Sequence, residues 1–105
     1  MIIEKNDAIS HGREGVTAVY YQLPNTHDGI TVARATFTGE HGERTIGHKP
    51  RIYLLLNGDA KFLINGEESI VKEGGLVVIE PKSTYNLWPV GESVEIILVS
   101  ELLNL

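Results

Sequence analysis

Three short apolar runs separated by glycine-containing turns lie between positions 51 and 85, and they constrain the fold more than any other feature. Asn57-Gly58 and Asn65-Gly66 supply residues that tolerate the positive φ angles of tight hairpin turns. Helices need longer apolar windows than these turns leave, so the spacing predicts an all-β sandwich or barrel. The three runs are Ile52 to Leu56, Ala60 to Ile64 and Leu76 to Ile79.

Further strands are predicted on both sides of this central stretch. Residues 16–23 are rich in β-branched and aromatic residues, and residues 94–100 are almost continuously apolar. Residues 30–37 alternate, which predicts one face made of Thr31, Ala33, Ala35 and Phe37. Residues 38–50 form the longest irregular segment, and loops of this length are often functional. No segment indicates a helix.

Length and composition predict one domain over residues 1–105, with 1–15 as an N-terminal arm or edge strand and 16–105 as the barrel. Apolar residues make up 42% of the chain and charged residues 22%, which is typical of globular proteins. The formal charge of −5 argues against a nucleic-acid partner. The chain has no cysteine and no apolar stretch of membrane-spanning length, so we expect a soluble, cytoplasmic protein without membrane contact.

Residues 51–58, Asn65-Gly66 and residues 74–85 together resemble the two motifs of the cupin superfamily and the short hairpin between them. The resemblance implies a small jelly-roll barrel of about 8–10 antiparallel strands. It also implies that the protein commonly dimerises and often holds one divalent metal ion with three histidines and a glutamate. The repeated spacing of strands and turns is the most specific part of this resemblance.

The metal-binding positions of the resembled motifs hold other residues in this chain. The glutamate position is Arg51, and the histidine position of the second motif is Tyr85 or Asn86. The two preceding histidine positions fall at Arg44 and Ile46, or at Thr45 and Gly47. We therefore expect no metal cofactor. The alternative is one divalent transition metal with non-standard ligands.

Four histidines remain as possible metal ligands. His41 and His48 lie in the glycine-containing loop, where solvated surface groups are the expected state. His11 and His27 are weaker candidates. The glutamates at positions 40, 43, 67, 68 and 73 are expected in turns, as solvating charges rather than as an acid and base pair.

Arg51, Tyr53 and Tyr85 form the most informative candidate site. Strand alternation sends Arg51 and Tyr53 to one face, and the resemblance brings Tyr85 to a neighbouring strand. A guanidinium and two phenols suit a small anionic or sugar-like ligand. The alternative is a satisfied core in which Arg51 pairs with Glu80 or Glu95. His48 and Trp88 complete the candidate ligand-binding set, although Trp88 also suits a barrel cap, a dimer contact or plain core packing.

Two classes of function follow. The first is a metal-free barrel that binds a small polar or anionic metabolite. The second is an enzyme: either a metal-independent isomerase or epimerase using tyrosine and histidine, or a metal enzyme. No histidine is securely inside the barrel by sequence, which favours binding; the sequence assigns no catalytic residue and leaves enzymatic activity open.

A homodimer is predicted, because the apolar ends, residues 1–3 and 102–105, are costly to leave exposed. The predicted core contains Tyr53, Leu55, Phe62, Ile64, Val78, Ile96 and Leu98.

Overall fold

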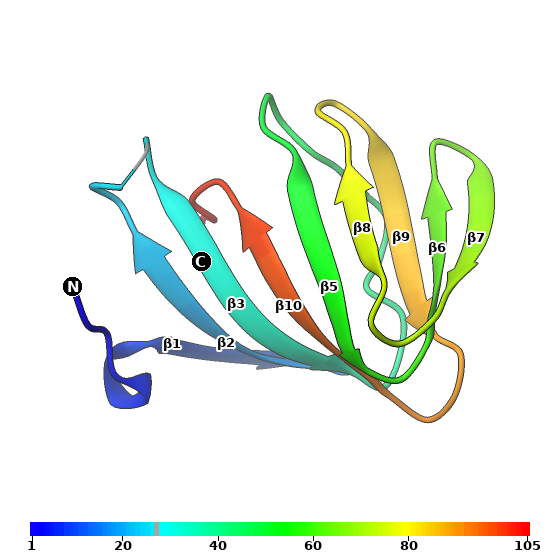
Figure 1. Cartoon of the computed structure of the whole chain (residues 1–105), viewed down its shortest axis with the longest axis horizontal. Helices are drawn as coiled ribbons and strands as arrows, with labels where there is room; N and C mark the ends of the chain where they lie inside the picture. The colour runs from blue at the N-terminus through cyan, green and yellow to red at the C-terminus, as the bar shows by residue number, and fades with distance from the viewer. Residues whose placement is uncertain (27) are drawn as a thin grey trace.

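The protein is an all-β structure made of two antiparallel sheets (Figure 1). The computed structural model describes residues 1–26 and 28–105; His27, a weak metal-ligand candidate by sequence, lies outside the described residues. The predicted all-β jelly roll of about 8–10 antiparallel strands is confirmed. The described residues form a 3-10 helix, η1 (Lys5–Asp7), and ten strands: β1 (Ile9–Arg13), β2 (Val16–Leu23), β3 (Ile30–Phe37), β4 (Arg44–Thr45), β5 (Arg51–Asn57), β6 (Ala60–Ile64), β7 (Glu67–Val71), β8 (Leu76–Ile79), β9 (Thr84–Pro89) and β10 (Val94–Ser100).

The two sheets differ in width and are offset from each other. The wider sheet has the strand order β1-β2-β3-β10-β5-β8, and the narrower has the order β4-β9-β6-β7. In Figure 1, β6, β7 and β9 stand on the same side as β8, while β1, β2 and β3 extend toward the opposite side. The strands β1, β2 and β3 are therefore the part of the wide sheet farthest from β6 and β7.

The two Asn-Gly turns make different connections: one joins two strands of the same sheet, and the other joins strands of different sheets. Asn65 and Gly66 have φ angles of 50° and 83° and close the predicted hairpin between β6 and β7. The second predicted hairpin, at Asn57-Gly58, is wrong, because the chain crosses there from the six-stranded to the four-stranded sheet. Gly58 has φ 87°, and a Cβ atom at this position would lie 2.6 Å from the carbonyl oxygen of Ser93. The crossing therefore requires glycine.

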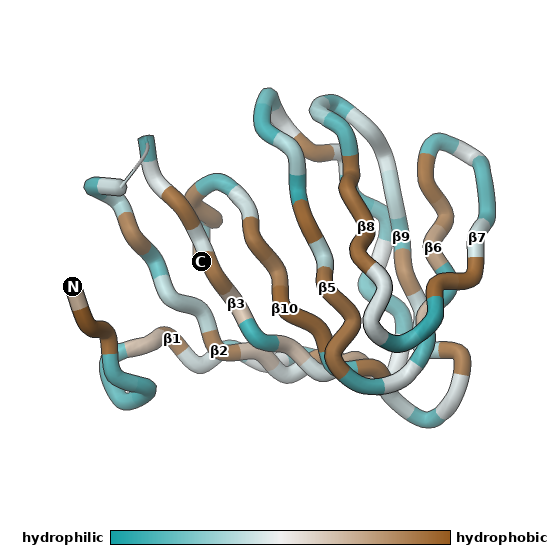
Figure 2. Tube along the Cα trace, in the orientation of Figure 1, coloured by the Kyte–Doolittle hydropathy of each residue, from teal (hydrophilic) through white to brown (hydrophobic). Residues whose placement is uncertain are grey.

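Strand alternation decides which side chains enter the space between the sheets. The alternation predicted for residues 30–37 is present in β3, where the face made of Thr31, Ala33, Ala35 and Phe37 is the buried one. Figure 2 shows hydrophobic residues gathered on β5, β8, β10 and β6. Five members of the predicted core are confirmed as buried, and Ile64 is partly buried against it. These five are Tyr53, Leu55, Phe62, Ile96 and Leu98.

The prediction that Val78 is buried is wrong. Its side chain is 44% exposed, while Val77 and Ile79 on either side of it are buried. All four residues of β8 are apolar, so the sequence of this strand does not indicate its inner face. The pairing with β5 does, because Val77 lies opposite Tyr53 and Ile79 lies opposite Arg51.

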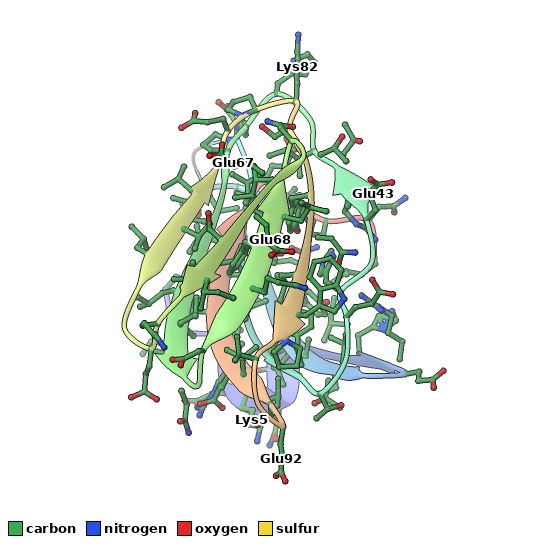
Figure 3. The ribbon with its side chains drawn as sticks, turned by 90° about the vertical axis from the view of Figure 1, so that its right-hand side faces the viewer. Lys5, Glu43, Glu67, Glu68, Lys82 and Glu92 are labelled. Carbon is green, nitrogen blue, oxygen red and sulfur yellow. The ribbon has the colours of Figure 1, made fainter. Side chains whose placement is uncertain are left out.

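Both edges of the fold carry strands at positions where the sequence leaves or favours irregular structure. Glu67 and Glu68 begin β7, an edge strand of the four-stranded sheet, rather than lying in a turn. Both residues are exposed at this edge, and Glu68, labelled in Figure 3, forms an ion pair with Lys61 at 3.5 Å, as charged residues on a protected sheet edge should. At the N-terminus, Ile9–Arg13 form the edge strand β1, which pairs with β2 and exposes all five of its residues.

Among residues 1–26 and 28–105, no helix is both long enough and apolar enough to cross a membrane.

Candidate functional site

A buried polar cluster lies between the two sheets. Arg51 is the first residue of β5, and Tyr53 follows two positions later on the same face. Tyr85 is the second residue of β9 in the other sheet. Both tyrosines are 1% exposed and Arg51 is 8% exposed. Alternation along β5 and β9 thus brings together the three residues that the sequence singles out.

Hydrogen bonds join this cluster through the hydroxyl group of Tyr85. Arg51 Nη1 donates to Tyr85 Oη over 2.8 Å, and the hydroxyl groups of Tyr53 and Tyr85 are hydrogen-bonded to each other. His41 Nε2 lies 3.4 Å from Tyr85 Oη on another side. Burial and the neighbouring Tyr85 raise the pKa of Tyr53 well above its ordinary value of 10, so Tyr53 keeps its proton at neutral pH.

His41 reaches the cluster from the loop between β3 and β4. Its backbone N–H donates to the carbonyl of Leu87 over 2.9 Å, and its ring packs between the rings of Phe37 and Tyr85. The prediction that His41 is a solvated surface group is wrong, because these contacts draw the loop against β9. His48, farther along the same segment, is exposed as expected.

The protonation of His41 follows from its surroundings. Burial lowers the pKa of His41 from 6.5 to about 4. The hydrogen bond to Gly42 opposes this shift, and the charges of Arg44, Arg13 and Arg51 add to it. The ring is therefore neutral at pH 7. Its Nδ1 lies 2.7 Å from the carbonyl oxygen of Gly42, which can only accept, so Nδ1 carries the proton. Nε2 is then an unprotonated acceptor facing the hydroxyl of Tyr85.

A cavity of about 330 Å³ opens beside the cluster. Its polar lining contains three arginines and two histidines, and in the described part of the chain no aspartate or glutamate side chain lines it. For a chain with a net charge of −5, this is a local reversal of charge. The lining residues are His11, Gly12, Arg13, Val16, Tyr20, Ala33, Ala35, Phe37, His41, Arg44, Arg51, Tyr53, Ile96, Leu98, Leu103, Asn104 and Leu105.

The alternative in which Arg51 pairs with a protein carboxylate is contradicted. Glu95 instead forms an ion pair with Arg34 on the outer face, at 3.0 Å, and Glu80 is exposed. Within the described residues, no ion pair involves Arg51. The polar partner that the protein gives Arg51 is a tyrosine hydroxyl, which is neutral when protonated. The guanidinium charge is left without a compensating protein anion.

Two candidate residues are not brought to the cavity. Trp88 lies on β9 between Leu87 and Pro89, and because Tyr85 and Leu87 point inward, Trp88 points outward. There its ring lies 4.8 Å from Lys61 Nζ, in a cation–π contact. His48 lies outside the cavity lining.

The cavity residues do not fit a divalent metal ion. The cavity offers two imidazoles, on His11 and His41, and the phenols of Tyr20 and Tyr53, and three guanidinium groups line the same space. Zinc and iron sites usually combine at least three imidazole, thiolate or carboxylate ligands. No group of three such side chains that could hold a metal occurs among residues 1–26 and 28–105.

Sequence reasoning missed several cavity residues. His11 and Arg13 come from β1, which resembles a polar arm in the sequence, and Arg44 comes from the two-residue strand β4. The segment after β10 folds back, since Gln22 Nε2 donates to the carbonyl of Leu103 over 2.7 Å. These contacts join residues far apart in the chain, and neither spacing nor periodicity indicates them.

No protein-family model matches the chain, and no curated protein sequence matches it. Solved structures do. A predicted oxalate decarboxylase from Thermotoga maritima superposes with a TM-score of 0.80 and 19% identity, covering 98% of this chain and all of the other. The nucleoside dehydratase Pac13 from Streptomyces gives a TM-score of 0.80 at 15% identity, covering 99% of this chain and 84% of that one.

A third matching structure is described as a cupin domain. The cupin domain of Schizosaccharomyces pombe Cnp3 matches with a TM-score of 0.68 and 14% identity over 78% of this chain, which spans 62% of the length of that domain. At these identities the likeness concerns the arrangement of strands. Together with the two-sheet topology and the predicted motifs, it establishes that this chain has the cupin fold.

Proposed function

We propose that this protein binds a small anionic metabolite in the cavity beside Arg51. One observation carries the proposal: the cavity is lined by three arginines and no acidic side chain of the described residues, within a chain of net charge −5. A buried guanidinium cannot lose its proton, so its charge needs an anion. The apolar walls would hold the body of the ligand, and the arginines its negative charge.

The test compares thermal stability with and without anions. Malonate, citrate and glucose 6-phosphate should raise the melting temperature of the wild type with saturation, because a ligand that binds only the folded state stabilises it. The variant Arg51→Met keeps much of the apolar stem and removes the charge, and its melting temperature should not respond. A broad anion series without any response in the wild type would remove the proposal.

A second candidate is a metal-independent enzyme that uses His41 and Tyr85 as base and acid. The unprotonated Nε2 of His41, 3.4 Å from Tyr85 Oη, favours it, because the pair could pass a proton at neutral pH. The fold supports enzymes of this size, since Pac13 is described as a nucleoside dehydratase, and a tyrosine-to-phenylalanine variant of it has been solved with uridine.

Proton exchange distinguishes the enzyme from a binding protein. A ligand found in the thermal assay is incubated in D₂O, and its C–H signals are followed by NMR. An enzyme of this class should exchange at least one carbon-bound proton, and His41→Gln should abolish the exchange while the ligand still raises the melting temperature. Binding without exchange over a day would contradict the enzymatic role and leave the binding role in place.

We also propose that two copies of the chain associate through the outer face of the six-stranded sheet. Leu54 and Leu76 are exposed cross-strand neighbours there, and Val78 lies opposite Ile52. Such an array of uncharged aliphatic side chains is costly to leave in water. Sedimentation should give a dimer at micromolar concentration and a monomer for Val78→Lys; a wild-type monomer would contradict the association.

A further inference from the structure

The cavity exists because the inner face of β3 carries small side chains. Ala33 and Ala35 lie opposite Leu98 and Ile96 of β10, whose inward positions carry large aliphatic side chains. On the other side, Ala35 is paired with Ala18 of β2. A methyl group leaves unfilled the space that a leucine or isoleucine takes up elsewhere in this core. Ala33 and Ala35 therefore form a flat apolar floor.

Two further cations line this cavity from opposite sheets. Arg13 belongs to β1 of the six-stranded sheet and Arg44 to β4 of the four-stranded sheet. One Nη atom of Arg13 donates to the carbonyl of His41, which ties this guanidinium to the cavity wall and leaves its other donors available. Neither arginine forms an ion pair in the described part of the chain.

The acidic side chain nearest in sequence to His41 is held by another partner. Glu40 accepts a hydrogen bond from Asn86 Nδ2 over 2.8 Å and is absent from the cavity lining. Arg13 and Arg44 are both exposed, whereas Arg51 and Tyr53 are buried. The cavity thus combines two exposed cations, Arg13 and Arg44, with buried hydrogen-bonding groups, and the alanine floor belongs to the same lining.

We propose that the ligand is a phosphate monoester of a single-ring compound. The ring would lie on Ala33 and Ala35, the phosphate between Arg13 and Arg44, and a polar group of the ring would reach the cluster of Arg51 and Tyr85. A phosphate dianion matches two guanidinium groups, which offer planar pairs of donors. A volume of about 330 Å³ is at the lower end of the range for ligand pockets, which favours one ring over two. This inference deepens the proposed anion-binding function and rests on it.

Binding is measured by titration calorimetry with ribose 5-phosphate and glucose 6-phosphate, each beside its unphosphorylated counterpart and beside inorganic phosphate. The wild type should bind at least one ester with a Kd at least tenfold lower than those of its unphosphorylated counterpart and of inorganic phosphate. Arg44→Met, at an exposed position, should weaken ester binding about tenfold or more. Arg34→Met, an arginine on the outer face, is the matched control and should leave it unchanged.

The floor is tested by Ala35→Leu, which fills the cavity with a larger side chain. This variant should lose binding of both esters while its melting temperature stays within a few degrees of the wild type. If it does not fold, Ala33→Val, a smaller change on the same floor, should weaken the esters and leave inorganic phosphate unaffected. Ester binding unchanged in a folded floor variant would overturn the placement of the ring.

The outcomes separate this inference from the function on which it rests. Equal affinity for esters and unphosphorylated rings, or for esters and inorganic phosphate, would overturn the phosphate monoester. The phosphate monoester would also be overturned if malonate or citrate, but no phosphate ester, raised the melting temperature of the wild type and not that of Arg51→Met. The anion-binding function would stand in that case. No response to any anion would overturn both.

Discussion

The two halves of the space between the sheets differ in the size of the side chains that point into it. On the side of β5 and β8, Leu55 and Ile79 meet Phe62 and Leu87 of the four-stranded sheet, and each of the four is 1% exposed or less. On the side of β2 and β3, the inward positions include three alanines, and the cavity opens above two of them. The first half stabilises the fold, and the second leaves room for a ligand. The six-stranded sheet forms one wall of both halves.

The largest effect is expected in the packed half. Phe62→Ala removes a fully buried ring and should lower the free energy of unfolding by about 3–5 kcal/mol, because the transfer free energy is lost and a cavity remains. Urea unfolding measures it. Ile70→Ala, on the exposed side of β7, is the control and should cost less than about 1 kcal/mol. Similar costs at both positions would mean that the packed half is not the stabilising one.

An intermediate effect on stability is expected from the acid titration of His41, whose ring packs between Phe37 of the wide sheet and Tyr85 of the narrow sheet. The pKa of this ring is lowered to about 4 in the folded protein and is near 6.5 when unfolded, so the unfolded chain binds more protons between these values. The free energy of unfolding should therefore be unaffected by this group above pH 6.5 and fall by up to about 3 kcal/mol as the pH drops to about 4.

Urea unfolding from pH 7.5 to 4 checks this titration. His41→Gln should flatten the profile over that range, whereas His48→Gln, in the exposed part of the loop, should keep the wild-type profile. A profile that is equally steep in His41→Gln would place the acid sensitivity elsewhere in the protein.

The smallest effect on stability is expected at Arg51. No carboxylate is stranded when Arg51→Met removes the charge, and Tyr85 keeps its hydrogen bond to Tyr53, so the free energy of unfolding should change by about 1 kcal/mol or less, in either direction. Arg34→Met breaks an exposed ion pair and should cost a similarly small amount. The two variants should differ in their response to anions, which only Arg51→Met should lose. A loss of about 3 kcal/mol in Arg51→Met would indicate a protein partner.

The sequence predicts the packed half better than the hollow half. Turns and apolar runs locate β5, β6 and β8, and alternation separates the two faces of β3. Where all residues of a strand are apolar, as around Val78, the face is set by pairing with β5 and cannot be inferred from periodicity. The cavity depends on contacts across long sequence separations. Arg51 and Tyr53 were predictable because alternation aims both at one face, and Tyr85 was predictable through the resemblance to the cupin motifs. Arg13 and His41 come from an edge strand and a loop.

The most direct test of the anion-binding cavity is the melting temperature of the wild type and of Arg51→Met against rising concentrations of citrate, malonate and glucose 6-phosphate at constant ionic strength. We predict a saturable increase for at least one of these anions in the wild type and none in the variant, because the anion compensates the charge of Arg51 only in the folded protein. A wild-type melting temperature that stays constant across the series, or one that rises equally in both proteins, would contradict it.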